Sequence, residues 1–159
     1  MQLFKDNELF LDTVSHTKAL RAKEVIGYFH TIKPNRIEAE ALSGITIGGE
    51  EDLKRAAAYF HNQGVKNVFI TLGAEGVFYS DEQEEGIVKA QKVIPQNATG
   101  AGDAFQAALV YAALHGYEIK EKVRFSMAAS ILAMSAKETI SKNLSVEAIE
   151  KIMNQMEEK

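Results

Sequence analysis

The chain contains no cysteine, and this absence removes several kinds of chemistry at once. Without thiols there is no disulfide, no cysteine nucleophile and no zinc–thiolate centre. Histidine is also scarce, and the four positions His16, His30, His61 and His115 do not have the spacing of metal ligands. We interpret these histidines as surface or packing residues.

Basic residues are not in excess, since 18 Lys and Arg stand against 22 Asp and Glu, for a net charge of −4. This balance argues against a nucleic acid or an anionic membrane as partner. Long apolar runs are missing too: the longest uncharged stretch, residues 104–117, is too short to span a bilayer and indicates a buried helix. Charge appears too early in Met-Gln-Leu-Phe-Lys-Asp for a signal peptide. We expect a protein of the cytoplasm.

The pattern along the chain predicts a single α/β domain over residues 1–159. Apolar or extended segments predict strands at 8–15, 30–35, 66–73, 76–80 and 86–94. Helical spacing predicts helices at 16–29, 36–45, 50–64, 101–115, 121–138 and 145–158. Alternating strands and helices indicate a Rossmann-like, mostly parallel sheet with helices on both faces. Glycine at 73 and 76 indicates a hairpin-like return between the strands at 66–73 and 76–80.

Particular residues define several of these elements. Pro34 favours an extended conformation at Lys33 and stops any helix there. The helix at 36–45 is expected to end near Gly44, and the helix at 50–64 has Gly64 as its predicted C-cap. Ser145 is the predicted N-cap of the last helix. The apolar stripe of the 50–64 helix consists of Leu53, Ala56, Ala57 and Phe60.

The stretch NATGAGDAF, residues 97–105, suggests a site. Gly100, Ala101 and Gly102 leave backbone amides unshielded where a helix begins, and such amides attract anions. The stretch is not a Walker loop, because Gly-Lys-Ser/Thr is absent, and Phe105 stands where the dinucleotide fingerprint needs a third glycine.

Asp103 at this helix start has two interpretations. It can be an ordinary acid at a helix N-terminus, which contributes about 0.3–1 kcal/mol. It can also accept a proton from a hydroxyl while the bare amides stabilise phosphoryl oxygens, as phosphoryl transfer requires. The glycines packed before Asp103 favour the second interpretation.

These residues resemble a known family. TGAGDAF resembles the C-terminal signature of the ribokinase-like (PfkB) carbohydrate kinases, and Asn35-Arg36-Ile37-Glu38 resembles the family's Asn-x-x-Glu element. VFITLGAEGVF is similar to the strand and glycine turn beside the family's nucleotide site. ELFLDTVSHTKA is similar to a segment of the pseudouridine-kinase-like branch.

The resemblance implies an ATP-dependent kinase that phosphorylates a hydroxyl of a sugar or nucleoside. Asp103 would be the catalytic base, Gly100, Ala101 and Gly102 the anion hole, and Asn35 and Glu38 the organisers of Mg²⁺ and phosphate oxygens. The resemblance further implies nucleotide contacts for a larger set: Thr71, Gly73, Gly76, Thr99, Ser126, Ala129 and Ser130. A loop around Ser141 and Asn143 would offer carbonyls to a monovalent cation such as K⁺, as in several relatives.

Some of these assignments have structural alternatives. Asn35 can be a plain helix N-cap, with Glu38 completing a capping box. TLGAEG alone is a turn, and we interpret Lys33 and Lys18 as solvated charges.

The chain also departs from the family pattern. Asn97-Ala98 replaces the Asp-Thr of many members, which would weaken or change any sugar-hydroxyl or cation contact. The family's N-terminal acceptor site and lid have no counterpart, so we expect the carboxyl-terminal, nucleotide-binding portion of a kinase with impaired turnover. An exposed sheet edge would favour a homodimer. The alternative function is a non-catalytic nucleotide-binding or self-associating fragment.

Overall fold

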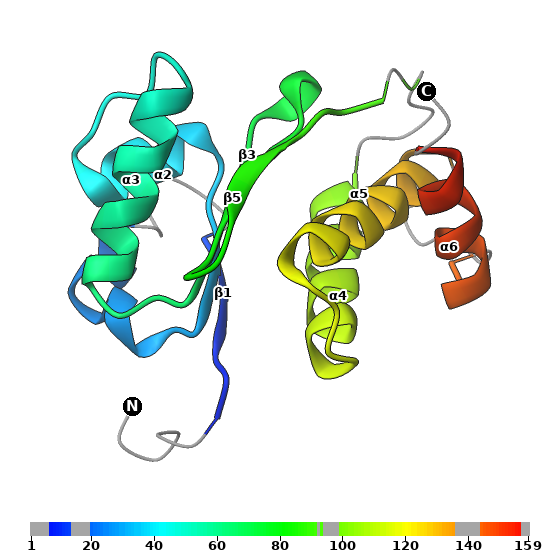
Figure 1. The fold of residues 1–159 in the computed structure, drawn as a ribbon, viewed down its shortest axis with the longest axis horizontal. Helices are drawn as coiled ribbons and strands as arrows, with labels where there is room; N and C mark the ends of the chain where they lie inside the picture. The colour runs from blue at the N-terminus through cyan, green and yellow to red at the C-terminus, as the bar shows by residue number, and fades with distance from the viewer. Residues whose placement is uncertain (1–6, 14–19, 92, 94–98, 136–143, 157–159) are drawn as a thin grey trace. The chain divides into compact units, whose positions relative to one another are not determined.

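The computed structural model describes residues 7–13, 20–91, 93, 99–135 and 144–156. Helices and strands alternate along the chain, which confirms the predicted α/β class. The chain divides into two compact units, Met1–Lys89 and Ala90–Lys159, and each is described by itself (Figure 1).

The first unit is built on a five-stranded sheet whose strand order follows the chain order. Its strands are β1 (Phe10–Asp12), β2 (Thr31–Lys33), β3 (Asn67–Thr71), β4 (Val77–Ser80) and β5 (Glu85–Val88). The β1–β2 and β2–β3 pairs are parallel, whereas β3–β4 and β4–β5 are antiparallel. The sheet is therefore mixed, and the prediction of a mostly parallel sheet was wrong, because the chain returns directly after β3 and β4 instead of crossing over through a helix.

Two helices, α2 (Arg36–Ser43) and α3 (Glu50–Asn62), lie together against one face of this sheet (Figure 1). The helix α2 ends where Gly44 adopts a left-handed conformation with φ 75°, as predicted. The C-cap of α3 is Gln63, one residue before the predicted Gly64.

The core of the first unit forms where the helices meet the sheet. The predicted stripe of α3 is buried in full. The main side chains in this core are Ile32, Val68, Ile70 and Phe78 from the strands and Leu42, Leu53, Ala56, Ala57 and Phe60 from the helices. The apolar spacing of α3 therefore predicted its buried face correctly.

The segment before β2 is helical, but not uniformly α-helical. Residues 20–22 form an α-helical turn and Lys23–Tyr28 form the 3-10 helix η2, while residues 16–19 lie outside the described ranges. Gly27 allows the backbone of η2 to approach the backbone of Gln63 closely, because a Cβ at this position would lie 2.0 Å from the carbonyl oxygen of Gln63. The backbone of η2 thus contacts the end of α3 directly.

The second unit consists of three helices, α4 (Ala101–Leu114), α5 (Ile119–Ser135) and α6 (Val146–Gln155). Its core contains small residues of α4 and α5, which allow the two helices to approach closely. The buried residues are Ala104, Ala108, Ala112, Phe125, Ala128, Ala129, Ala133 and Ile149. Tyr111 and Phe125 stack inside this unit with ring centroids 5.5 Å apart.

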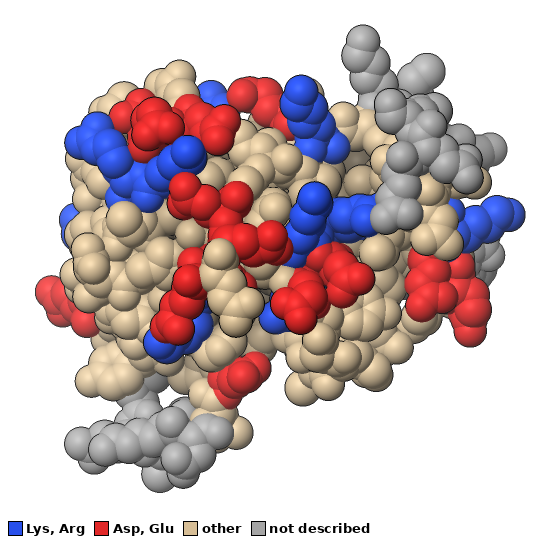
Figure 2. Space-filling view, viewed as in Figure 1, with Lys and Arg blue, Asp and Glu red and all other residues tan. Residues whose placement is uncertain are grey.

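Charged side chains of both signs are intermingled on the face drawn in Figure 2. Lys54 illustrates this arrangement, since its ammonium lies within 3.7 Å of Glu50, Glu51 and Glu85. Within the described ranges, every helix falls short of a bilayer-spanning segment in length or in hydropathy.

Candidate active site

The carboxyl ends of β2 and β3 lie side by side in the first unit, and Asn35 follows β2 after Pro34. Asn35 forms an isolated parallel bridge with Thr71 at the end of β3. The Thr71 amide donates to the Pro34 carbonyl at 3.0 Å, which extends the pairing beyond the strands. Parallel strands place their carboxyl ends at one edge, and ligands of open α/β sheets bind at that edge.

Asn35 and Glu38 form a complete capping box at the start of α2. The Asn35 side-chain oxygen Oδ1 accepts from the Glu38 backbone N–H at 2.9 Å, and the Asn35 backbone N–H donates to Glu38 Oε2 at 3.0 Å. The capping box, which is the alternative to a metal-binding role for this pair, is therefore present in the structure. Asn35 is exposed and Glu38 is buried, so only Asn35 presents most of its side chain to solvent.

Glu38 receives a second hydrogen bond that sequence reasoning missed. The Thr13 hydroxyl, directly after β1, also donates to Glu38 Oε2. Among the described residues no donor contacts the other carboxylate oxygen, Oε1. The signal for Thr13 was available, because a polar residue at the end of a predicted strand next to a parallel neighbour lies at the ligand-binding edge.

Lys33 differs from its predicted role as a solvated charge. Its side chain is only 9% exposed, and its ammonium forms an ion pair with Asp12 at 2.9 Å. That prediction was wrong because Asp12 lies on the neighbouring strand β1, and only the pairing of β1 with β2 places it next to Lys33. A buried lysine needs such a counter-charge.

The glycines after β3 are required by the backbone. Gly73 begins the short 3-10 turn η3 (Gly73–Glu75), and Gly73 and Gly76 have φ values of 61° and 119°. The Leu72 amide donates to the Gly76 carbonyl at 2.9 Å, which closes the turn between β3 and β4. Their side-chain-free surface fits the predicted nucleotide contact, which stays a prediction.

In the second unit, α4 begins without a side-chain cap. Its N-cap is Gly100, in a left-handed conformation with φ 88°, and Thr99 before it is exposed. A Cβ at Gly102 would meet nothing within 4 Å, so this turn is open. Uncapped amides at a helix start favour an anion.

Asp103 stands in the first turn of α4 and is exposed. Among the described residues its carboxylate forms no hydrogen bond or ion pair. Ser130 of α5 supports the turn from outside, because its hydroxyl donates to the Ala101 carbonyl at 2.9 Å. This position is compatible with the predicted role of Asp103 as a proton acceptor, which stays a prediction.

The other two residues of α5 that are predicted to contact the nucleotide, Ser126 and Ala129, are buried. Ser126 is fully buried, and its hydroxyl donates to the Lys122 carbonyl at 2.7 Å within its own helix. Ala129 is also buried. Their predicted proximity to the adenine stays a prediction. Ser141, Asn143, Asn97 and Lys18 lie outside the described residues.

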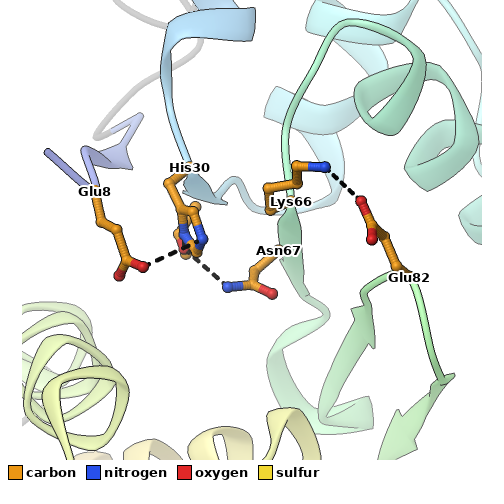
Figure 3. Close-up of polar contacts among 6 residues, drawn as sticks. Glu8, His30, Lys66, Asn67 and Glu82 are labelled. Carbon is orange, nitrogen blue, oxygen red and sulfur yellow. Dashed lines mark hydrogen bonds and ion pairs between the residues drawn. The ribbon is translucent and has the colours of Figure 1, made fainter. Parts of the chain in front are cut away.

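A second polar cluster occupies the opposite, amino-terminal edge of β2 and β3 (Figure 3). The Asn67 side-chain amide nitrogen Nδ2 donates to Thr31 Oγ1 at 3.2 Å, and His30 Nε2 lies 3.6 Å from Glu8 Oε1. Lys66 pairs with Glu82, and this hydrogen bond lowers the pKa of the Glu82 carboxyl. These groups satisfy one another, so we interpret this cluster as structural.

The described residues contain no group of three or more His, Asp or Glu side chains that could hold a metal ion by themselves. Magnesium rarely needs such a cage, because one or two protein carboxylates and substrate phosphates suffice. The Oε1 of Glu38, which has no donor in the described part of the chain, fits that limited role. The residues present are therefore compatible with Mg²⁺ carried by a nucleotide.

Comparison with known proteins now defines the class. Residues 4–146 match the family model described as pfkB family carbohydrate kinase. The pseudouridine kinase of Escherichia coli K12 is 40% identical over 139 residues, which cover 87% of this chain and 44% of that protein.

Solved structures agree with this match. A candidate sugar kinase from Clostridium perfringens has a TM-score of 0.92 and 41% identity, covering 97% of this chain and 49% of the other. Arabidopsis thaliana ribokinase, solved with ribose and ATP, has a TM-score of 0.74 and 27% identity, covering 82% and 43%. Escherichia coli phosphofructokinase-2, solved with potassium, has a TM-score of 0.76 and 29% identity, covering 88% and 45%.

The chain belongs to the PfkB carbohydrate kinase family, as the sequence motifs predicted. It spans less than half the length of the pseudouridine kinase that it matches.

Proposed function

We propose that this chain carries the nucleotide-binding and proton-accepting part of an ATP-dependent kinase for a sugar or nucleoside, with the ribokinase-like fold of helices on both sheet faces. The observation that carries the proposal is Asp103: an exposed carboxylate without a partner among the described residues, in the uncapped first turn of α4. The family match supports the same reaction class.

In the proposed reaction, Asp103 accepts the proton of the acceptor hydroxyl. The hydroxyl oxygen then forms a bond to the γ-phosphorus of ATP, while the bond from that phosphorus to the bridging oxygen breaks and ADP leaves. The amides at Gly100, Ala101 and Gly102 stabilise the negative charge on the transferred phosphoryl group.

The first unit would hold the nucleotide. Thr71, Gly73 and Gly76 would contact it, and the nucleotide contacts that the family resemblance implies for Thr99, Ser126 and Ser130 stay predictions. Glu38 and Asn35 would bind Mg²⁺, directly or through its water, and the ion when bound neutralises phosphate charge. The potassium of a related structure supports a monovalent-cation requirement.

Pseudouridine is the first acceptor to test, because a pseudouridine kinase is 40% identical to the chain. The chain is incubated with ATP, Mg²⁺ and K⁺, and ADP is measured with pseudouridine, ribose or fructose 6-phosphate and without acceptor. We expect ADP formation above background with one of these acceptors, at a low rate.

The same assay distinguishes the alternative function. A chain that spans less than half of its relative can retain nucleotide binding without turnover. Thermal stabilisation by ATP without acceptor-dependent ADP would identify a non-catalytic nucleotide-binding fragment. The absence of both responses would contradict both proposals.

A further inference from the structure

We propose that Thr13 is a positioning residue for Glu38, which it holds in the orientation needed to bind Mg²⁺ of the nucleotide. The Thr13 hydroxyl and the Asn35 backbone N–H both donate to Oε2 of this carboxylate. Oε1 is thereby left to the cation or to water bound to the cation. This inference rests on the proposed function and adds a residue to it.

Burial distinguishes this arrangement from an ordinary capping box. Thr13 is 2% exposed and Glu38 is 4% exposed. A glutamate that only completes a cap can remain in solvent, where its charge carries no desolvation cost. Burying this carboxylate beneath the start of α2 is costly, so a role that needs a fixed carboxylate explains it better than capping alone.

The two donors also make the two carboxylate oxygens unequal. Oε2 has its acceptor capacity used by two hydrogen bonds from separate elements, the end of β1 and the N-cap of α2. Oε1 has no donor among the described residues. A carboxylate held in this way cannot exchange its oxygens by rotating without losing both bonds.

A fixed oxygen ligand matters for magnesium in particular. Mg²⁺ requires near-ideal octahedral geometry and keeps most of its water, so a carboxylate that moves binds it poorly. Groups that orient metal ligands from outside typically contribute 10- to 100-fold to metal affinity. The Thr13 hydroxyl is such a group for Glu38.

The test compares Thr13→Val, which removes the hydroxyl at nearly constant shape, with Thr13→Ser, which retains it. The measurement is the Mg²⁺ concentration that gives half of the thermal stabilisation by a non-hydrolysable ATP analogue. We expect Thr13→Val to raise this concentration about tenfold and Thr13→Ser to change it less than about twofold. Circular dichroism verifies the fold, and Thr13→Ala replaces Thr13→Val if the valine variant is unfolded.

A double substitution tests whether Thr13 acts through Glu38. Glu38→Gln should raise the required Mg²⁺ concentration, and adding Thr13→Val should raise it no further. If Thr13→Val lowers only the unfolding temperature and leaves the Mg²⁺ dependence unchanged, Thr13 is merely structural and the inference fails alone. If the wild-type chain shows no Mg²⁺-dependent stabilisation by the analogue, the proposed function fails and the inference falls with it.

Discussion

At the scale of single residues, Asn35 and Glu38 cap the helix α2, and this structural role is separate from their proposed role in binding Mg²⁺ and phosphate. The two side chains complete a capping box, and Glu38 is buried under the start of α2. A residue with two roles requires variants that separate them. The chain offers such variants at Asn35, because serine caps a helix almost as well as asparagine does.

We expect Asn35→Ala to lower the free energy of unfolding by about 1 kcal/mol, because the Glu38 amide loses its acceptor. Asn35→Ser should leave the stability nearly unchanged. If Asn35 also contacts Mg²⁺ or phosphate, both variants should require more Mg²⁺ for nucleotide binding. Urea unfolding and Mg²⁺ titration measure the two effects, and an Asn35→Ser variant with wild-type Mg²⁺ dependence would assign Asn35 to capping alone.

Residue-level interpretation from sequence succeeded where the partner was close in the chain and failed where it was distant. The Asn35–Glu38 contact spans one helical turn and was foreseen. The Lys33–Asp12 ion pair and the Thr13–Glu38 hydrogen bond each join segments more than one element apart. Only the register of β1 against β2 brings such residues together.

At the scale of elements, α4 and α5 are joined by a hydrogen bond next to the proposed anion site. The Ser130 hydroxyl donates to the Ala101 carbonyl, whereas the Ser126 hydroxyl bonds within its own helix. Ser130→Ala should therefore lower the free energy of unfolding by about 0.5–1.5 kcal/mol. Ser126→Ala, the matched control, should cost less, because the Ser126 hydroxyl bonds only to a carbonyl of its own helix and joins no two elements. Equal losses in chemical denaturation would show that the bond between the helices contributes nothing.

The helix α6 provides a pH-dependent test. A hydrogen bond from the Glu147 backbone and a second from the Ser145 side chain lower the pKa of the Glu147 carboxyl from its usual 4.5. A pKa lowered in the folded state stabilises the fold above the unfolded value, and this contribution is lost as the pH falls through the folded value.

Glu147→Gln should accordingly lower the unfolding temperature at pH 7, and this difference from the wild type should shrink as the pH falls through the lowered pKa of Glu147. Thermal unfolding of both proteins across this range measures the difference. A difference in unfolding temperature that stays constant as the pH is lowered would mean that the charge of Glu147 does not stabilise α6.

The elements themselves could largely be predicted, but their connections only in part. The stripe of α3, the stop at Gly44 and the Ser145 cap follow from local rules and are present. The glycines at 73 and 76 indicated a hairpin-like return after β3, and the antiparallel β3–β4 pair confirms it. The antiparallel pairing of β5 with β4 was not predicted, because alternating strands and helices favour parallel pairing.

At the scale of the whole molecule, the proposed machinery is distributed over two compact units with separate cores. Asn35, Glu38 and Thr71 belong to the first, and Gly100 and Asp103 to the second. The central claim is that these groups serve one phosphoryl transfer, with Asp103 as the proton acceptor.

The most direct test is the rate of acceptor-dependent ADP formation by the wild-type chain and by Asp103→Asn, at saturating Mg²⁺ and ATP. Glu121→Gln is the matched control, since Glu121 is also an exposed acid in the first turn of a helix. We expect Asp103→Asn to be about 10² to 10⁴ times slower, while its ATP affinity and the activity of the control remain near wild type. An Asp103→Asn chain that phosphorylates its acceptor at the wild-type rate would show that Asp103 is not the proton acceptor.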